Sequence, residues 1–162
     1  MRHTGALGVT TRGDREIVMT RTFDAPRDLV FRAMTTPELL KRWFSGPPGW
    51  SLEVCTVDLW VGGNYRYVWR GPDGFVMGMG GTFIEVKPPE KIVQTERFDE
   101  SWYPGEAVGT MTLVEEDGRT HLTLSVVYQS PEALEAVLKT PMKQGVAAGY
   151  DRLAELLAQP EI

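Results

Sequence analysis

The sequence predicts an α+β fold in which a curved antiparallel sheet of about seven strands surrounds a long C-terminal helix. Three patterns indicate it: helical periodicity over the last thirty residues, consecutive strand patterns from Trp50 to Tyr128, and two short helices after the first strand. Short turns between the strands favour antiparallel pairing. One face of such a sheet needs a cover, and only the terminal helix is long enough to provide it.

The C-terminal segment contains two helix starts in succession. Ser130-Pro131-Glu132 supplies a hydroxyl N-cap, a proline at the first helical position and an acid at the positive end of the helix dipole. Thr140-Pro141-Met142 repeats this pattern, and an interior proline interrupts a helix. We therefore expect a short helix from Pro131 to about Lys139 and a longer one from Pro141 to about Ala158, roughly 25 Å in length.

One apolar stripe of the longer helix changes character along its length. Its residues step by three and four, and they are Met142, Gly145, Val146, Gly149, Tyr150, Leu153, Leu156 and Leu157. The first half is thin or pliable, whereas the leucines are bulky. An interior glycine costs a helix about 0.5–1 kcal/mol relative to alanine. Two interpretations stay open: the helix is held away from the sheet at this end, or the glycines admit a strand or an aromatic ring.

The segment before the sheet contains the first strand and the two short helices. Arg15 to Phe23 alternates as a strand, and the helices begin at Asp24-Ala25-Pro26 and Thr36-Pro37-Glu38. Arg21 shares the apolar face of the strand, where an ion pair with a nearby acid is favoured over a ligand contact.

The length and composition indicate a single domain over residues 15–162 and a disordered N-terminal arm over residues 1–14. Apolar residues make up 42% and charged residues 24% of the 162, which is ordinary for a soluble globular protein. Cys55 is the only cysteine, so neither an internal disulfide nor a thiolate metal site is expected. We expect no metal and no cofactor.

Charge and hydropathy exclude two classes of partner. The net charge is −5 and no basic run occurs, which argues against sequence-independent binding to nucleic acid. No apolar run approaches the roughly 20 residues of a membrane span, and the N-terminus lacks the apolar segment of a signal peptide. The sequence therefore predicts a cytoplasmic protein without a membrane partner.

An ordered set of motifs gives the chain a family resemblance. The motifs are Ala25-Pro26, Thr36-Pro37-Glu38, Trp43, Gly62-Gly63, Gly81-x-Phe83-x-Glu85-Val86, Pro88-Pro89-Glu90-Lys91, and Met142-x-x-Gly145 followed by Tyr150-x-x-Leu153. From about Ile17 to Ala158 the sequence resembles the activator-of-Hsp90-ATPase-like branch of the START/Bet v 1-like superfamily. The resemblance implies the helix-grip fold with an internal cavity. The superfamily includes lipid and hormone binders, polyketide cyclases, dehydratases, self-sacrificing resistance proteins and co-chaperone domains, and the fold does not decide among them.

Large aromatic and methionine side chains are the candidates for a cavity wall. Aromatic rings offer wide apolar surfaces and methionine adapts to irregular shapes, so ligand cavities are often lined this way. The predicted ligand-binding residues are Trp43, Trp60, Tyr67, Trp69, Met77, Met79, Phe98, Met111 and Met142, with Gly145, Val146 and Gly149 from the terminal helix.

Two carboxylates, Glu85 and Glu96, are the candidates for acid–base chemistry. Glu85 shares strand parity with Met79 and Phe83. If that face is inward, burial raises the pKa of Glu85 and makes proton transfer possible. The alternative, which we favour, is a carboxylate paired with Arg or Lys or hydrated at the strand end.

Three functional hypotheses follow. The first is a non-catalytic binder of a hydrophobic, aromatic or polycyclic small molecule. The second is a polyketide cyclase- or dehydratase-like enzyme that uses Glu85 or Glu96 with Tyr67 or Arg21. The third is an Hsp90-type chaperone partner, suggested only by the family resemblance. A homodimer formed through a sheet edge or the loop around Trp102 is a further hypothesis.

Overall fold

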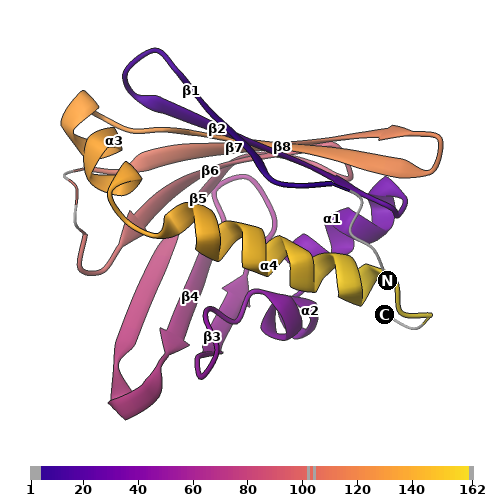
Figure 1. The fold of residues 1–162 in the computed structure, drawn as a ribbon, viewed down its shortest axis with the longest axis horizontal. Helices are drawn as coiled ribbons and strands as arrows, with labels where there is room; N and C mark the ends of the chain where they lie inside the picture. Colours follow the sequence, from indigo (N-terminus) through magenta and orange to yellow (C-terminus); the bar gives the residue numbers. More distant parts are fainter. Residues whose placement is uncertain (1–4, 102, 104, 161–162) are drawn as a thin grey trace.

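The computed structural model describes residues 5–101, 103 and 105–160. In this part of the chain, eight strands form one antiparallel sheet in the order β1-β2-β8-β7-β6-β5-β4-β3, which curves around the last helix (Figure 1). The strands are β1 (Gly8–Arg12), β2 (Glu16–Phe23), β3 (Ser51–Val57), β4 (Asn64–Arg70), β5 (Val76–Lys87), β6 (Lys91–Phe98), β7 (Ala107–Glu116) and β8 (Arg119–Val127). The helices are α1 (Arg27–Thr35), α2 (Pro37–Trp43), α3 (Pro131–Leu138), α4 (Met142–Leu157) and a 3-10 turn, η1 (Pro72–Gly74).

This architecture confirms the predicted fold class. The long α4 runs beneath the concave side of the sheet, and the short helices α1 and α2 lie near its C-terminal end (Figure 1). The break before α4 is at Thr140-Pro141, as predicted. The Ser130 hydroxyl accepts a hydrogen bond of 3.1 Å from the Ala133 amide, so the expected cap of α3 is formed.

The N-terminal arm differs from the prediction of a disordered segment. Residues Gly8–Arg12 form β1, an eighth strand that pairs with β2 from Gly8↔Thr20 to Arg12↔Glu16. Gly13, at a φ of +65°, allows the tight turn between the two strands. This strand is ordered by backbone pairing with the edge of β2. The side chains of the segment lack the alternating pattern that would predict a strand. Residues 1–4 of the predicted arm, and Trp102 in the loop proposed for dimerisation, lie outside the described residues.

The buried apolar side chains form two clusters rather than one. The larger cluster joins α1, α2 and the C-terminal half of α4 to the sheet, and the smaller one lies beneath α3. Phe98 and Leu124 contact both clusters from between them. The two clusters therefore cover the two ends of the concave face of the sheet. A cavity can exist in the space between these clusters.

The α4 helix is packed firmly only in its C-terminal half. Gly149, Tyr150, Leu153, Ala154, Leu156 and Leu157 are its buried residues. Met142 and Val146 are only half-buried, and Gly145 is exposed. The stripe thus has the two halves that the sequence indicates, a clamped end and a loosely covered end.

An ion pair between a buried arginine on β2 and a half-exposed aspartate joins α4 to the sheet. Arg21 Nη1 on β2 lies 2.9 Å from Asp151 Oδ1, and the Arg21 side chain is only 1% exposed. Its guanidinium also lies 5.6 Å from the Phe23 ring centroid. The ion pair that the sequence favours for Arg21 is confirmed.

We predict that Asp151→Ala lowers the free energy of unfolding by about 3 kcal/mol, because it leaves a cation buried without its partner. Urea denaturation measures this. The control is Asp99→Ala, which breaks the exposed pair between Asp99 and Arg66 and is expected to cost less than about 1 kcal/mol. Equal losses in the two variants would contradict this role for the Arg21–Asp151 pair.

Candidate functional site

A cavity of about 520 Å³ lies between the concave face of the sheet and the N-terminal half of α4. Its walls come from strands β2 and β4 to β8, from helices α1 to α4, and from the loops after α2, before β7 and after β8. Two lining residues, Pro47 and Gly145, are exposed, so they mark where the cavity opens to solvent. We call this place the cavity mouth.

The structure places all but one of the predicted ligand-binding residues on this cavity. They are Trp43, Tyr67, Trp69, Met77, Met79, Phe98, Met111, Met142, Gly145, Val146 and Gly149. The strand residues alternate along their strands, as Tyr67 and Trp69 do on β4, because successive side chains point to opposite faces of a sheet. That these residues bind a ligand stays a prediction.

Trp60 is the exception, and its placement in the cavity wall is wrong. Its side chain is 61% exposed and it does not line the cavity. It lies in the turn between β3 and β4, where the Trp60 amide donates to Asp58 O at 2.9 Å and the Gly63 amide donates to Trp60 O at 2.8 Å. A turn at the sheet edge does not follow the alternation of a strand, so aromatic character alone misplaces this residue.

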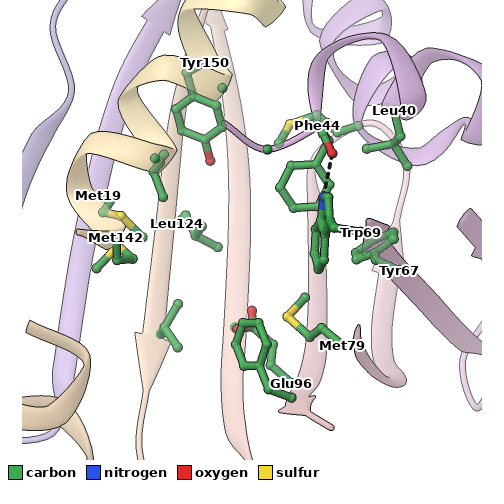
Figure 2. Close-up of a pocket in the computed structure, with 18 of the residues that line it drawn as sticks. Met19, Leu40, Phe44, Tyr67, Trp69, Met79, Glu96, Leu124, Met142 and Tyr150 are labelled. Carbon is green, nitrogen blue, oxygen red and sulfur yellow. Dashed lines mark hydrogen bonds between the residues drawn. The ribbon is translucent and has the colours of Figure 1, made fainter. Parts of the chain in front are cut away.

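Hydrogen bonds hold the aromatic wall in place. The Trp43 indole donates to Ala33 O at 2.9 Å, which joins α2 to α1. The Trp69 indole donates to Phe44 O at 2.9 Å (Figure 2). The Phe44 ring lies edge-on to Tyr67 and Trp69, with centroids 5.3 Å and 5.2 Å away. These rings are therefore fixed in orientation before any ligand arrives.

The glycines of α4 face open space more than close neighbours. A Cβ added at Gly145 would meet no described atom within 4 Å. A Cβ at Gly149 would lie 4.0 Å from Trp43 Cζ3, which is an ordinary contact. Of the two interpretations of this thin helix face, the contacts favour a helix held away from the sheet.

The cavity also contains polar groups. Figure 2 shows Tyr150 directing its hydroxyl into the cavity from α4, with Glu96 at the opposite side on β6. Sequence reasoning missed the contributions of Phe44, Trp50, Gln94, Tyr103, Tyr128 and Tyr150. Two signals were available: Gln94, Glu96 and Phe98 alternate along β6, and Tyr150 belongs to the helical stripe. The residues outside regular elements, such as Tyr103, give no such signal.

Glu96 is a buried carboxylate without a neutralising cation among the described residues. Burial raises the pKa of Glu96 to about 7, and no interaction of the described residues lowers it. Its accessible surface is intermediate rather than nil. The raised pKa and the remaining accessible surface are compatible because Glu96 lines the cavity, so that this surface faces the cavity interior. Glu96 therefore titrates in the range where a carboxyl can accept or donate a proton near neutral pH.

Phenols surround this carboxylate. Burial, and secondarily the nearby Glu96 carboxylate, raises the pKa of Tyr103 to about 12. The pKa values of Tyr128 and Tyr150 are raised by the same two causes, with burial the larger. These hydroxyls therefore remain protonated hydrogen-bond donors at neutral pH.

Glu85 does not line the cavity. The interpretation that we favoured from the sequence, a carboxylate paired with Lys or Arg, is confirmed. Its carboxylate lies 3.3 Å from Lys87 Nζ and 3.5 Å from Lys91 Nζ, and the Lys87 contact foremost holds the pKa of Glu85 below its usual range. A register shift between Phe83 and Glu85 is the physical reason. The bulge changes the parity, and Val86 packs against the core beyond it.

This combination of a curved antiparallel sheet and a long C-terminal helix defines a helix-grip protein. The profile of the family described as Activator of Hsp90 ATPase homolog 1-like protein matches residues 24–158. The chain belongs to this family, as the resemblance in its motifs predicts.

Solved structures of bacterial proteins share the fold over nearly the whole chain. A Rhodobacter sphaeroides protein is 30% identical, with a TM-score of 0.90, and the match covers 95% of this chain and 99% of the other. Protein Ms6760 of Mycobacterium smegmatis is 26% identical, with a TM-score of 0.83 and coverage of 98% and 100%. Protein NE0264 of Nitrosomonas europaea is 26% identical, with a TM-score of 0.79 and coverage of 90% and 96%. No curated protein is similar enough to match.

No group of three His, Cys, Asp or Glu side chains in the described part of the chain could hold a metal ion. None of the described helices combines the length and hydropathy that crossing a membrane requires.

We predict that Glu96→Gln stabilises the protein increasingly as the pH rises. The pKa of Glu96 is raised in the folded state, from 4.5 to about 7, so ionisation opposes folding above the unfolded-state pKa. The gain is near zero at pH 4, grows between these two pKa values, and reaches on the order of 3 kcal/mol above them. Urea denaturation at pH 4 and pH 8 measures it.

The matched control is Glu85→Gln on the neighbouring strand. The pKa of Glu85 is lowered in the folded state, so this variant loses a little stability at neutral pH instead of gaining it. A Glu96→Gln variant whose stability relative to the wild type is the same at both pH values would show that Glu96 is hydrated.

Proposed function

We propose that the protein binds a hydrophobic, ring-containing small molecule in the cavity between the sheet and α4. The observation that carries this proposal is a cavity of about 520 Å³ whose walls are almost entirely aromatic, aliphatic and methionine side chains. Ligand sites of this kind are concave and apolar, with few polar groups that orient the ligand. The family membership is consistent with ligand binding.

The energetics support an apolar ligand. Removing about 200 Å² of apolar ligand surface from water contributes about 5 kcal/mol, from which the entropic cost of association is subtracted. Fixed walls reduce that cost, because Trp43 and Trp69 are already held by hydrogen bonds. The flat, rigid rings of the wall favour a ligand that is itself flat or polycyclic.

Panels of lipids, flavonoids and polyketide-like compounds test the proposal directly. Three lining tryptophans, Trp43, Trp50 and Trp69, report on the cavity, so a bound ring system should quench their fluorescence saturably. We predict that Gly145→Leu weakens binding at least about tenfold, because the added side chain enters space that is open at the cavity wall.

The matched control for this variant is Ala148→Leu. Ala148 is exposed on the same helix and does not line the cavity, so this variant adds similar volume and should keep wild-type affinity. If no compound quenches the wild type, the proposal fails. If both variants bind as the wild type does, the ligand lies elsewhere.

A cyclase- or dehydratase-like activity is a second candidate, favoured by Glu96. A carboxyl group whose pKa is about 7 can act as a general acid or base on a bound substrate. Tyr67, the predicted partner, also lines the cavity, whereas Arg21 and Glu85 are engaged in ion pairs. Recovery of every bound compound unchanged after incubation would remove this candidate. A chaperone partner, a homodimer and a cytoplasmic location stay predictions.

A further inference from the structure

One polar group of the cavity would be left unsatisfied by a purely apolar ligand. Glu96 lines the cavity, and the described residues give its carboxylate no hydrogen bond and no ion pair. Burying an ionised carboxylate without a partner is expensive. A ligand that supplies the missing partner would recover this cost on binding.

The site of the carboxylate is shaped by the opposite strand. Gln94 pairs with Gly109 in the ladder between β6 and β7, and Glu96 follows two residues later on the same face. A Cβ at Gly109 would lie 2.4 Å from Glu96 Oε2 and 3.4 Å from Glu96 Cδ. A side chain at position 109 would therefore force the Glu96 carboxylate, the flexible end of its side chain, to move away from β7.

Two cations beside the cavity, Arg152 in its wall and Arg21 near Tyr150, already have polar partners. Arg21 pairs with Asp151 at 2.9 Å, and Arg152 Nε donates to Trp43 O at 3.0 Å. Arg97, adjacent to Glu96 on β6, is exposed on the other face of the sheet. None of them lowers the pKa of Glu96.

The other titratable groups that interact with Glu96 are phenols from several elements. They are Tyr65 and Tyr67 on β4, Tyr103 before β7, Tyr128 after β8 and Tyr150 on α4. The Tyr65 hydroxyl is committed to Thr95 O at 2.6 Å. Because burial keeps all five protonated, none carries a negative charge that could compete with Glu96 for a ligand cation.

This inference rests on the proposed ligand-binding function and specifies the polar end of the ligand. We propose that the ligand is an amphiphilic ring compound with a protonated amine, which the Glu96 carboxylate binds while the aromatic walls enclose the apolar part. A charge-assisted hydrogen bond in a water-poor site is stronger than a neutral one. Aromatic faces such as those of Tyr67 and Trp69 attract cations as well.

A matched pair of fluorescent probes tests this inference. The probes are 9-anthracenylmethylamine and 9-anthracenylmethanol, which share a ring system and differ in charge. At pH 8 the amine should bind about tenfold more tightly than the alcohol. This preference should fall at least about fivefold at pH 5.5, where Glu96 is protonated while the amine keeps its charge.

Variants assign the preference to Glu96. Glu96→Gln should abolish the preference for the amine and leave the affinity for the alcohol nearly unchanged. Gly109→Ala, which crowds the carboxylate, should reduce the preference as well, and it serves as an independent variant if Glu96→Gln folds poorly. Glu85→Gln removes an exposed carboxylate from the neighbouring strand and should behave as the wild type does.

The outcomes separate the two proposals. Equal affinities for amine and alcohol in the wild type, or a preference that is independent of pH, would overturn the amine inference and leave ligand binding intact. Tighter binding of the alcohol at pH 5.5 would instead indicate a ligand that accepts a hydrogen bond from protonated Glu96, which also overturns it. If neither probe binds and the panels give no ligand, the proposed function fails and the inference fails with it.

Discussion

The unequal packing of α4 is the constraint on which the rest of the structure depends. Leu153, Leu156 and Leu157 bury one half of the helix against the sheet and the short helices, and the Arg21–Asp151 ion pair fixes the same half. The other half carries Gly145 and Val146 in place of bulky side chains. A helix anchored at one end and thin at the other cannot close the concave face of the sheet, so a cavity remains.

The chemistry of the cavity follows from the same arrangement. The two apolar clusters cover the ends of the concave face, and indole hydrogen bonds hold Trp43 and Trp69 of the larger cluster in place. In that setting Glu96, the one carboxylate among the described lining residues, is partly removed from water and keeps a proton to about pH 7. The pKa of Glu96 is raised because its described neighbours are apolar or phenolic and leave it without a cation. Gly109 leaves the space that the carboxylate occupies.

Much of the fold and most of the cavity wall could be predicted because they depend on local rules. The caps at Ser130 and the break at Pro141 define the last two helices, and strand alternation places Tyr67, Trp69, Met77 and Met79 on one face. What failed lies outside the alternation of a predicted strand. The strand Gly8–Arg12 exists through its partner β2, and Trp60 lies in a turn at the sheet edge. The bulge after Phe83 turns Glu85 outward, which agrees with the ion pair that the sequence favours for this residue. The isolation of Glu96 is a three-dimensional property that no spacing in the sequence reveals.

Crystals pressurised with xenon would test the central claim most directly, because xenon occupies apolar cavities and is excluded from packed interiors. We predict xenon density between Gly145 on α4 and the inner face of the sheet, near Met79 and Met111. Absence of xenon there, with Trp69 and Met142 in contact across a filled interior, would contradict the account.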